Sequence, residues 1–216
     1  MNQFGRFVAL LAPWLVRREW LELRVHLAQA YKLNNDSIDC PSVLAQQLLI
    51  SGEDHRFFCH GGIDLIAVCR AAWRGIVFRR REGASTIEMQ VIRVVSGRYE
   101  RTLRRKIREM ALATLVTQVS PKHALPAIYL RLGYYGWRMN GFTAACRRID
   151  RRSESLTPIE TARLVARLKY PEPRDVSPQR WELIDVRARH LLRLHVRHRQ
   201  DHTYFGLGTK SSYAAV

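Results

Sequence analysis

Apolar residues recur at helical spacing along most of the chain. The clearest case is residues 101–119, where Leu103, Ile107 and Leu115 fall on one face of the expected helix. No segment has convincing apolar–polar alternation, so strands are expected only in a short hairpin near Gly133–Gly141. The pattern therefore predicts a mainly helical protein.

Capping residues and prolines set the expected ends of the other helices. Ser85 with Glu88, and Thr157 with Glu160, fit the capping box, in which a hydroxyl and a carboxylate satisfy free N–H groups of the first turn. Asp64 is a further candidate N-cap. We expect these helices at residues 41–52, 65–78, 86–95, 158–170 and 181–199.

The first part of the chain has its own apolar segment, Phe7–Val16, flanked by Arg6 and by Arg17–Arg18. It is too short to span a membrane, and no small-residue cleavage site follows it. We expect residues 1–31 to be a membrane-surface segment or a shortened anchor. A helix packed on the domain is the alternative.

The composition is that of a folded protein with an unusual charge. The 216 residues are 47% hydrophobic and 25% charged, which is enough for a sizeable core and excludes wholesale disorder. Lys and Arg number 36 against 19 Asp and Glu, so the formal net charge is +17. Such a field attracts nucleic acid, anionic lipid headgroups or phosphorylated substrates, and charge alone does not choose among them.

Metal-binding patterns are weak. The four cysteines, Cys40, Cys59, Cys69 and Cys146, lack CxxC or zinc-finger spacing. We expect buried, unpaired thiols, with three disulfide pairings open in an oxidising compartment. His195, His198 and His202 have helical spacing, but a solvated basic helix face explains them better than a metal site.

Candidate chemistry begins where an expected helix runs into Glu53 and Asp54. Aromatic residues, His60 and a Gly61-Gly62 turn follow. A carboxylate at a helix end beside aromatic rings can act as a general acid or base. The alternative is a solvated acidic helix end.

Two later segments are suited to anions. Residues 82–93 place small residues before a helix N-terminus, where free N–H groups and the dipole favour negative charge. In residues 101–110, Arg105 and Lys106 lie on the same helical face as Glu109, which could form a phosphate clamp. The alternatives are a plain helix cap and a solvated, salt-bridged face.

Taken in order, these segments resemble glycosyltransferase family 51, the peptidoglycan glycosyltransferases that polymerise lipid II. Matches to its five motifs lie between Glu53 and Pro171: EDHRFFCHGG, GASTIEMQ, RRKIRE, IYLRLGYYG and ETARLVARLKYP. The resemblance implies a mainly α fold, with a lysozyme-like helical lobe and a smaller membrane-facing jaw. It implies a glycosyltransferase domain at residues 32–203 and a flexible tail at 204–216.

The resemblance also implies roles for individual residues. Glu53 would be the general base that deprotonates the 4-hydroxyl of the acceptor sugar. Glu109 would lie in the donor region and help to orient or stabilise the departing diphosphate. Both are thus candidate catalytic residues. The substrate-binding residues implied are Asp54, Phe57, His60, Ser85, Thr86, Gln90, Arg93, Arg105 and Lys106.

The implied partners are a lipid-linked disaccharide-peptide, the growing glycan strand and an anionic membrane surface, with no nucleic acid expected. The implied location is the periplasmic or outer face of the bacterial cytoplasmic membrane. No metal site is expected among the side chains, although a divalent cation such as magnesium is a candidate at the diphosphate.

Several positions depart from the family motifs. The second motif carries Ala84, Glu88 and Met89 in place of Gly, Thr and Gln, and the fourth carries Arg131 in place of Asn. A carboxylate at residue 88 would weaken the positive field of the helix end. We therefore expect a monofunctional peptidoglycan glycosyltransferase, or a descendant of one with reduced activity. The alternative is a non-catalytic module that binds lipid-linked glycan or a cell-wall partner.

Overall fold

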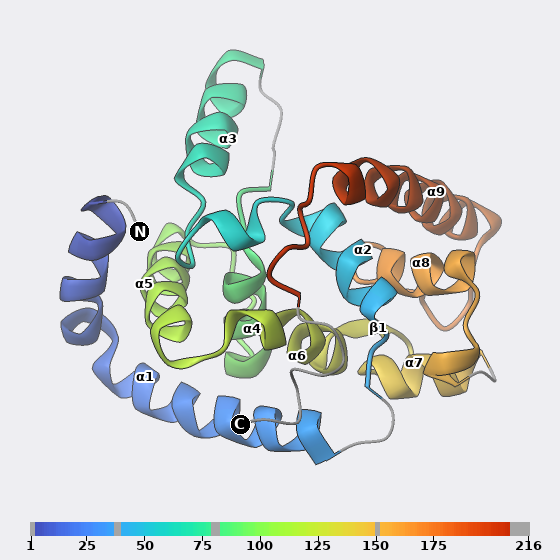
Figure 1. The fold of residues 1–216 in the computed structure, drawn as a ribbon, viewed down its shortest axis with the longest axis horizontal. Helices are drawn as coiled ribbons and strands as arrows, with labels where there is room; N and C mark the ends of the chain where they lie inside the picture. The colour runs from blue at the N-terminus through green and yellow to red at the C-terminus, as the bar shows by residue number, and fades with distance from the viewer. Residues whose placement is uncertain (1–2, 37–39, 79–82, 150–151, 208–216) are drawn as a thin grey trace.

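The structure, a computed structural model, describes residues 3–36, 40–78, 83–149 and 152–207. Over these residues the protein is mainly helical, as the sequence predicts (Figure 1). The α-helices are α1 (Gln3–Asp36), α2 (Val43–Glu53), α3 (Leu65–Phe78), α4 (Ile87–Ser96), α5 (Leu103–Val119), α6 (Leu125–Leu132), α7 (Phe142–Arg148), α8 (Pro158–Arg167) and α9 (Pro178–Gln200). Short 3₁₀ helices are η1 (Phe57–Cys59), η2 (Lys122–Ala124) and η3 (Ser153–Ser155). The expected hairpin is present as β1 (Tyr134–Gly136) paired antiparallel with β2 (Met139–Asn140).

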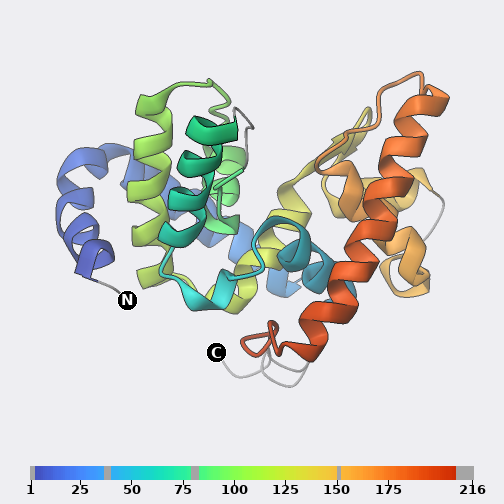
Figure 2. The same cartoon turned by 90° about the horizontal axis from the view of Figure 1, so that it is seen from above.

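The helices form a lysozyme-like body around α2, α4 and α6. Helix α4 packs against α5 and α6, while α2 packs against α6, α8 and α9. Figure 2 shows α1, α3 and α5 on one side of the molecule and α7, α8 and α9 on the other. Side chains from both sides meet in one apolar core, in which Leu48, Ile92 and Leu130 are buried.

Helix α3 stands apart from this body. It projects outward in Figure 1, and none of its residues is buried. Its start is as expected, because Asp64 Oδ1 accepts hydrogen bonds from the N–H groups of Ile66 and Ala67. Its apolar side chains are exposed, Trp73 by 65% and Ile76 by 80%. The helix therefore has the position expected of the smaller jaw.

The turn before α3 requires glycine. Gly62 has a φ of 93°, and a Cβ there would lie 2.4 Å from the carbonyl oxygen of Ala113. Its own carbonyl accepts a 2.8 Å hydrogen bond from Thr86 Oγ1. The Gly61-Gly62 turn thus lets the segment after α2 pass close to α5 and to the start of α4.

The two capping boxes have different outcomes. The predicted box at α8 is confirmed, since Thr157 and Glu160 cap each other's backbone N–H groups with Pro158 as the first helical residue. The predicted box at α4 is wrong, because the N-cap is Thr86 and not Ser85. Glu88 is then the second helical residue, and its side chain is fully buried instead of turning back to the cap.

Helix α1 packs on the domain over the part whose side chains are described. Its backbone breaks at Val16, and beyond this point Leu23 and Leu27 are buried where the helix packs along α5. The side chains of residues 3–15 lie outside the described part, so the anchor stays a prediction. Among the helices described, none is long and apolar enough to cross a membrane.

The cysteines and the histidines near the end of α9 can be compared with the sequence predictions. The four cysteines all lie in the described residues and form no disulfide, but only Cys146 is buried, so the prediction of burial is wrong for Cys40, Cys59 and Cys69. Within the described residues, His195, His198 and His202 do not form a metal-ligand cluster.

Candidate active site

Glu53 is the last residue of α2, and its carboxylate is fixed by two other helices. Gln90 of α4 donates a hydrogen bond from Nε2 to Glu53 Oε2 over 3.2 Å. Arg187 of α9 donates from Nη2 to Glu53 Oε1 over 3.1 Å, and also to the carbonyl oxygen of Gly52 over 2.7 Å. The Glu53 side chain is 25% exposed, so it is held in place yet open to a ligand.

A cavity of about 330 Å³ lies beside this carboxylate. The end of α2 contributes Glu53, Asp54 and His55 to its lining, and α3 contributes Arg70 and Arg74. A neutral hydroxyl can therefore reach the carboxylate, while an anionic group in the same cavity would be near two guanidinium groups.

Glu109 is the centre of a second cluster. Its side chain is almost fully buried in α5, and Arg93 of α4 contacts it with two parallel hydrogen bonds of 2.9 Å. Arg105 Nη1 donates to Glu109 Oε1 from the same helix. The hydrogen bond and charge of Glu109 raise the pKa of Arg93 despite its partial burial. The carboxylate is thus saturated, and its effect is to fix two guanidinium groups.

Lys106 lies next to this cluster. Its Nζ donates to Ser85 Oγ over 2.8 Å, and Arg93 Nη2 approaches the same hydroxyl at 3.5 Å. Burial lowers the pKa of Lys106, while the charge of Glu109 opposes that effect. Arg93 of α4 and Lys106 of α5 therefore converge on Ser85, just before the N-terminus of α4, while Arg105 lies on the Glu109 carboxylate.

A third cluster begins at Asp54, the residue after Glu53. Asp54 accepts hydrogen bonds from the Ile87 N–H over 3.2 Å and faces His60 Nε2 at 3.0 Å. The fully buried Glu88 pairs with Lys122 Nζ at 3.1 Å. Burial raises the pKa of Glu88, and the positive charge of Lys122 opposes the rise. Ligand atoms of Asp54, His60 and Glu88 lie within 4.8 Å of one another, a geometry that can hold a metal ion.

The predicted site residues are thus divided among three neighbouring groups. Glu53 lies with Gln90, and Glu109 lies with Arg93, Arg105, Lys106 and Ser85. Asp54 lies with His60, whose ring contacts the buried ring of Phe57. Thr86 caps α4 and binds Gly62, so its hydroxyl is used within the fold.

Two residues with evident roles were not among the predicted site residues. Arg187 belongs to a strongly basic helix, where no local pattern separates it from its neighbours. Lys122 follows Ser120-Pro121 and fits no motif. Both reach the site only because α9 packs on α2 and because η2 lies beside the loop after α2.

The mainly helical, lysozyme-like body is the fold expected of a transglycosylase domain. The chain belongs to the transglycosylase family, whose members it matches over residues 26–195. It is 36% identical over 136 residues to penicillin-binding protein 1A of Rickettsia prowazekii, and 34% identical over 149 residues to penicillin-binding protein 1A of Neisseria gonorrhoeae. These matches cover 61% and 67% of this chain but only 17% and 18% of the relatives.

Proposed function

We propose that the protein is a peptidoglycan glycosyltransferase that polymerises lipid II into glycan strands. The observation that carries the proposal is the pairing of an open carboxylate, Glu53, with a separate cluster of cations around Ser85. Helix α4 connects the Glu53 carboxylate with the cation cluster, because Gln90 contacts Glu53 and Arg93 contacts Glu109. A base and a binding site for a leaving diphosphate are the two parts that this transfer requires.

In the proposed reaction, the acceptor sugar's 4-hydroxyl gives its proton to Glu53 as its oxygen forms a bond to C1 of the donor. The bond between C1 and the lipid diphosphate breaks, and the diphosphate leaves with the electron pair. Arg93, Arg105 and Lys106 stabilise the charge that develops there. Glu109 acts by fixing Arg93 and Arg105.

The Glu109 carboxylate at this donor site offers no unbound oxygen to a divalent cation such as magnesium. Both oxygens of Glu109 are already bound by guanidinium groups. The donor set at this position is cationic, which suits phosphate oxygens and not a metal ion. No step of the proposed reaction depends on a metal.

The proposed partners are the lipid-linked disaccharide-peptide, the growing strand and an anionic membrane at the periplasmic face of the cytoplasmic membrane. The net charge of +17 and the exposed apolar side chains of α3 support the membrane surface. No part of the proposal requires nucleic acid.

The second candidate is a non-catalytic module that binds lipid-linked glycan, and the departures at Glu88 and Arg131 favour it. Within the described residues, Arg131 has a buried Nη1 without a hydrogen-bond partner, and this residue is the altered position of the fourth motif. Reduced activity is the intermediate possibility between the two candidates.

A polymerisation assay with labelled lipid II decides between them. The wild-type protein should extend glycan strands, and Glu53→Gln should abolish extension while helical content by circular dichroism stays unchanged. Binding of lipid II without polymer formation by the wild type would favour the module. Retention of most activity by Glu53→Gln would exclude Glu53 as the base.

A further inference from the structure

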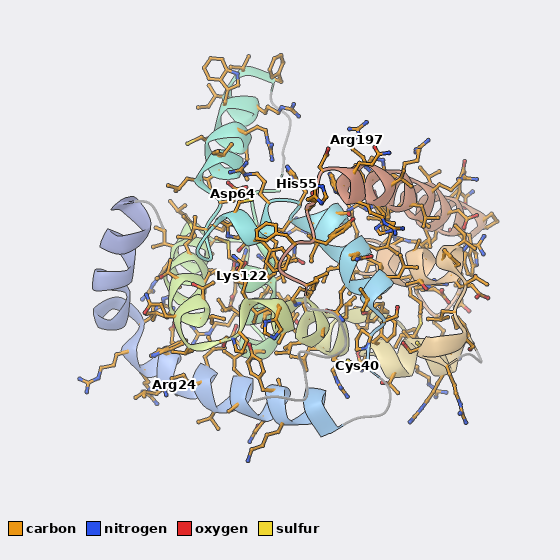
Figure 3. The ribbon with its side chains drawn as sticks, in the orientation of Figure 1. Arg24, Cys40, His55, Asp64, Lys122 and Arg197 are labelled. Carbon is orange, nitrogen blue, oxygen red and sulfur yellow. The ribbon has the colours of Figure 1, made fainter. Side chains whose placement is uncertain are left out.

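Lys122 joins three parts of the protein that are distant in sequence. Its ammonium group pairs with the Glu88 carboxylate at the start of α4, at 3.1 Å. It donates a hydrogen bond to the carbonyl oxygen of His60 and lies 4.7 Å from the centre of the Phe57 ring. Figure 3 labels Lys122 near the centre of the view, among helices that surround the loop after α2.

Those contacts fix the loop that follows the proposed base. Asp54 follows Glu53 directly, caps α2, and is bound by both the Ile87 N–H and the ring of His60. His60 is in turn held at its carbonyl by Lys122. A continuous chain of contacts therefore leads from Lys122 through His60 and Asp54 to the residue next to Glu53.

We propose that Lys122 is a positioning residue for Glu53, acting as the internal cation that holds the Asp54–Gly62 loop against α4. The proposal rests on the function proposed above. Lys122 does not act on the reacting atoms, because the side chains that contact Glu53 are Gln90 and Arg187. Its effect is on the direction and rigidity of the carboxylate, to which catalysis is sensitive at the level of about 1 Å.

The surrounding charges support an ammonium group at this position. Asp54 and Glu88 are both buried carboxylates, and burial of such groups is costly unless a cation and hydrogen bonds accompany them. Although Asp54, His60 and Glu88 have the spacing of metal ligands, Lys122 already places a positive charge beside Glu88. A divalent ion would therefore meet a repelling neighbour.

The test separates positioning from simple charge compensation. Lys122→Met removes the cation but leaves Glu88 buried without its partner. The double variant Lys122→Met with Glu88→Gln removes the unpaired charge as well. Glu88→Gln alone keeps the contacts of Lys122 with His60 and Phe57. Lys169→Met is the matched control, since Lys169 is exposed and lies near Tyr170, away from the loop.

We expect the double variant to recover thermal stability lost in Lys122→Met but to keep a kcat about tenfold below wild type, with KM changed by no more than about twofold. Glu88→Gln and Lys169→Met should keep kcat within about threefold of wild type. Recovery of wild-type kcat in the double variant would overturn the proposal, because Lys122 would then serve only to neutralise Glu88.

Hydrogen–deuterium exchange tests the same idea without polymerase activity. The amides of Phe57 and Cys59 donate to Asp54 and Arg56 within the loop, at 2.9 and 2.7 Å. Peptides covering residues 54–62 should exchange faster in the double variant, and peptides from α8 should not change. If the wild type makes no polymer, the proposed function fails, while unchanged exchange in this loop refutes the role of Lys122 separately.

A metal titration covers the remaining alternative. Zn²⁺ or Mn²⁺ should raise the melting temperature of the wild-type protein by no more than it raises that of Glu88→Gln. A rise confined to the wild type would identify Asp54, His60 and Glu88 as a metal site and overturn the proposal.

Discussion

Gln90 donates a hydrogen bond to the Glu53 carboxylate, and the same helix carries Arg93, which binds Glu109 one turn later. Residues 90 and 93 are three apart, so their side chains lie on the same side of α4. The proposed base and the proposed diphosphate site are therefore connected by one helical turn. Their relative position depends on where α4 begins, which Thr86 sets as the N-cap.

Gln90→Ala should raise the free energy of activation, measured through kcat, by more than it changes the free energy of unfolding. The side chain orients a partly exposed carboxylate, and a hydrogen bond to a charged group contributes about 1.5–3 kcal/mol. We expect a fall in kcat of roughly tenfold to a hundredfold, measured as the initial rate of lipid II polymerisation. Gln200→Ala, at the exposed end of α9, is the control and should have no effect. An unchanged rate in Gln90→Ala would show that Arg187 alone suffices to hold Glu53.

Glu109→Gln should destabilise the protein, because it leaves Arg93 and Arg105 without their common counter-ion. Removal of one partner from a buried ion pair costs about 3–5 kcal/mol, and urea denaturation should detect a loss at the lower end of this range. Glu22→Gln is the control, since Glu22 pairs with Arg18 on the exposed surface of α1. Its effect should be below about 1 kcal/mol. Equal effects of the two substitutions would contradict the view that Glu109 organises the arginines.

The sequence predicted the helices well because their apolar spacing and caps are local properties. Asp64, Thr157 and Glu160 act at helix ends as expected. Glu88 was misassigned because the capping-box pattern fits Ser85 with Glu88, whereas the N-cap is Thr86, which has Met89 three residues later. A shift of one residue turns a side chain by about 100° around the helix. Only tertiary packing, which places Lys122 beside Glu88, decides which register is adopted.

The residues of the candidate site were predictable from the motifs, but their contacts were not. Motif order indicated Glu53, Glu109 and the cations near them, while the cation that contacts Glu53 is Arg187, more than a hundred residues away. Spacing along the chain contains no information about this contact, because it arises from the packing of α9 on α2. The jaw position of α3 likewise follows from its lack of burial and not from its helical pattern.

The burial of Glu88 changes what should happen on replacing it with the Thr of the family motif. If its carboxylate faced the donor site, Glu88→Thr would tighten diphosphate binding by about 1 kcal/mol, the scale of a helix-end charge. In the structure the carboxylate faces Lys122 and is shielded from solvent. We therefore expect donor affinity to stay within about twofold, measured by titrating a non-reactive lipid-diphosphate analogue. A several-fold gain in affinity would contradict the observed orientation.

Glu88 should also affect how stability depends on pH. Burial raises its pKa in the folded state above the ordinary value of 4.5. As the pH rises above 4.5, Glu88 loses its carboxyl proton in the unfolded chain before it does so in the folded protein. The contribution of Glu88 to the free energy of unfolding is therefore complete at low pH and decreases as the pH rises toward the folded-state pKa. Measured from pH 4 upward, the unfolding free energy of the wild type should therefore fall relative to Glu88→Gln, which does not titrate. A difference that stays constant, or that grows in favour of the wild type, would contradict a raised pKa.

Helix α3 should contribute to binding of anionic membranes. Its exposed apolar side chains include Trp73, Ile76 and Phe78, and Arg70 and Arg74 belong to the same helix. Insertion of apolar side chains at an interface is strengthened by basic neighbours when the lipids are anionic. Ile76→Asp removes the most exposed of the apolar groups and adds a charge of the wrong sign.

The measurement is sedimentation with vesicles that contain phosphatidylglycerol, at low and high salt. Loss of one inserted side chain contributes about 1.5–3 kcal/mol, so Ile76→Asp should weaken partitioning by roughly tenfold or more. Val196→Asp is the matched control, because Val196 is 60% exposed on α9, outside the projecting helix. Salt should weaken the wild-type interaction, since exposed charges are screened over about 10 Å at 0.1 M salt. Equal losses of vesicle binding in Ile76→Asp and Val196→Asp would mean that α3 is not the membrane-binding element. Salt-independent binding to neutral vesicles would refute the electrostatic contribution.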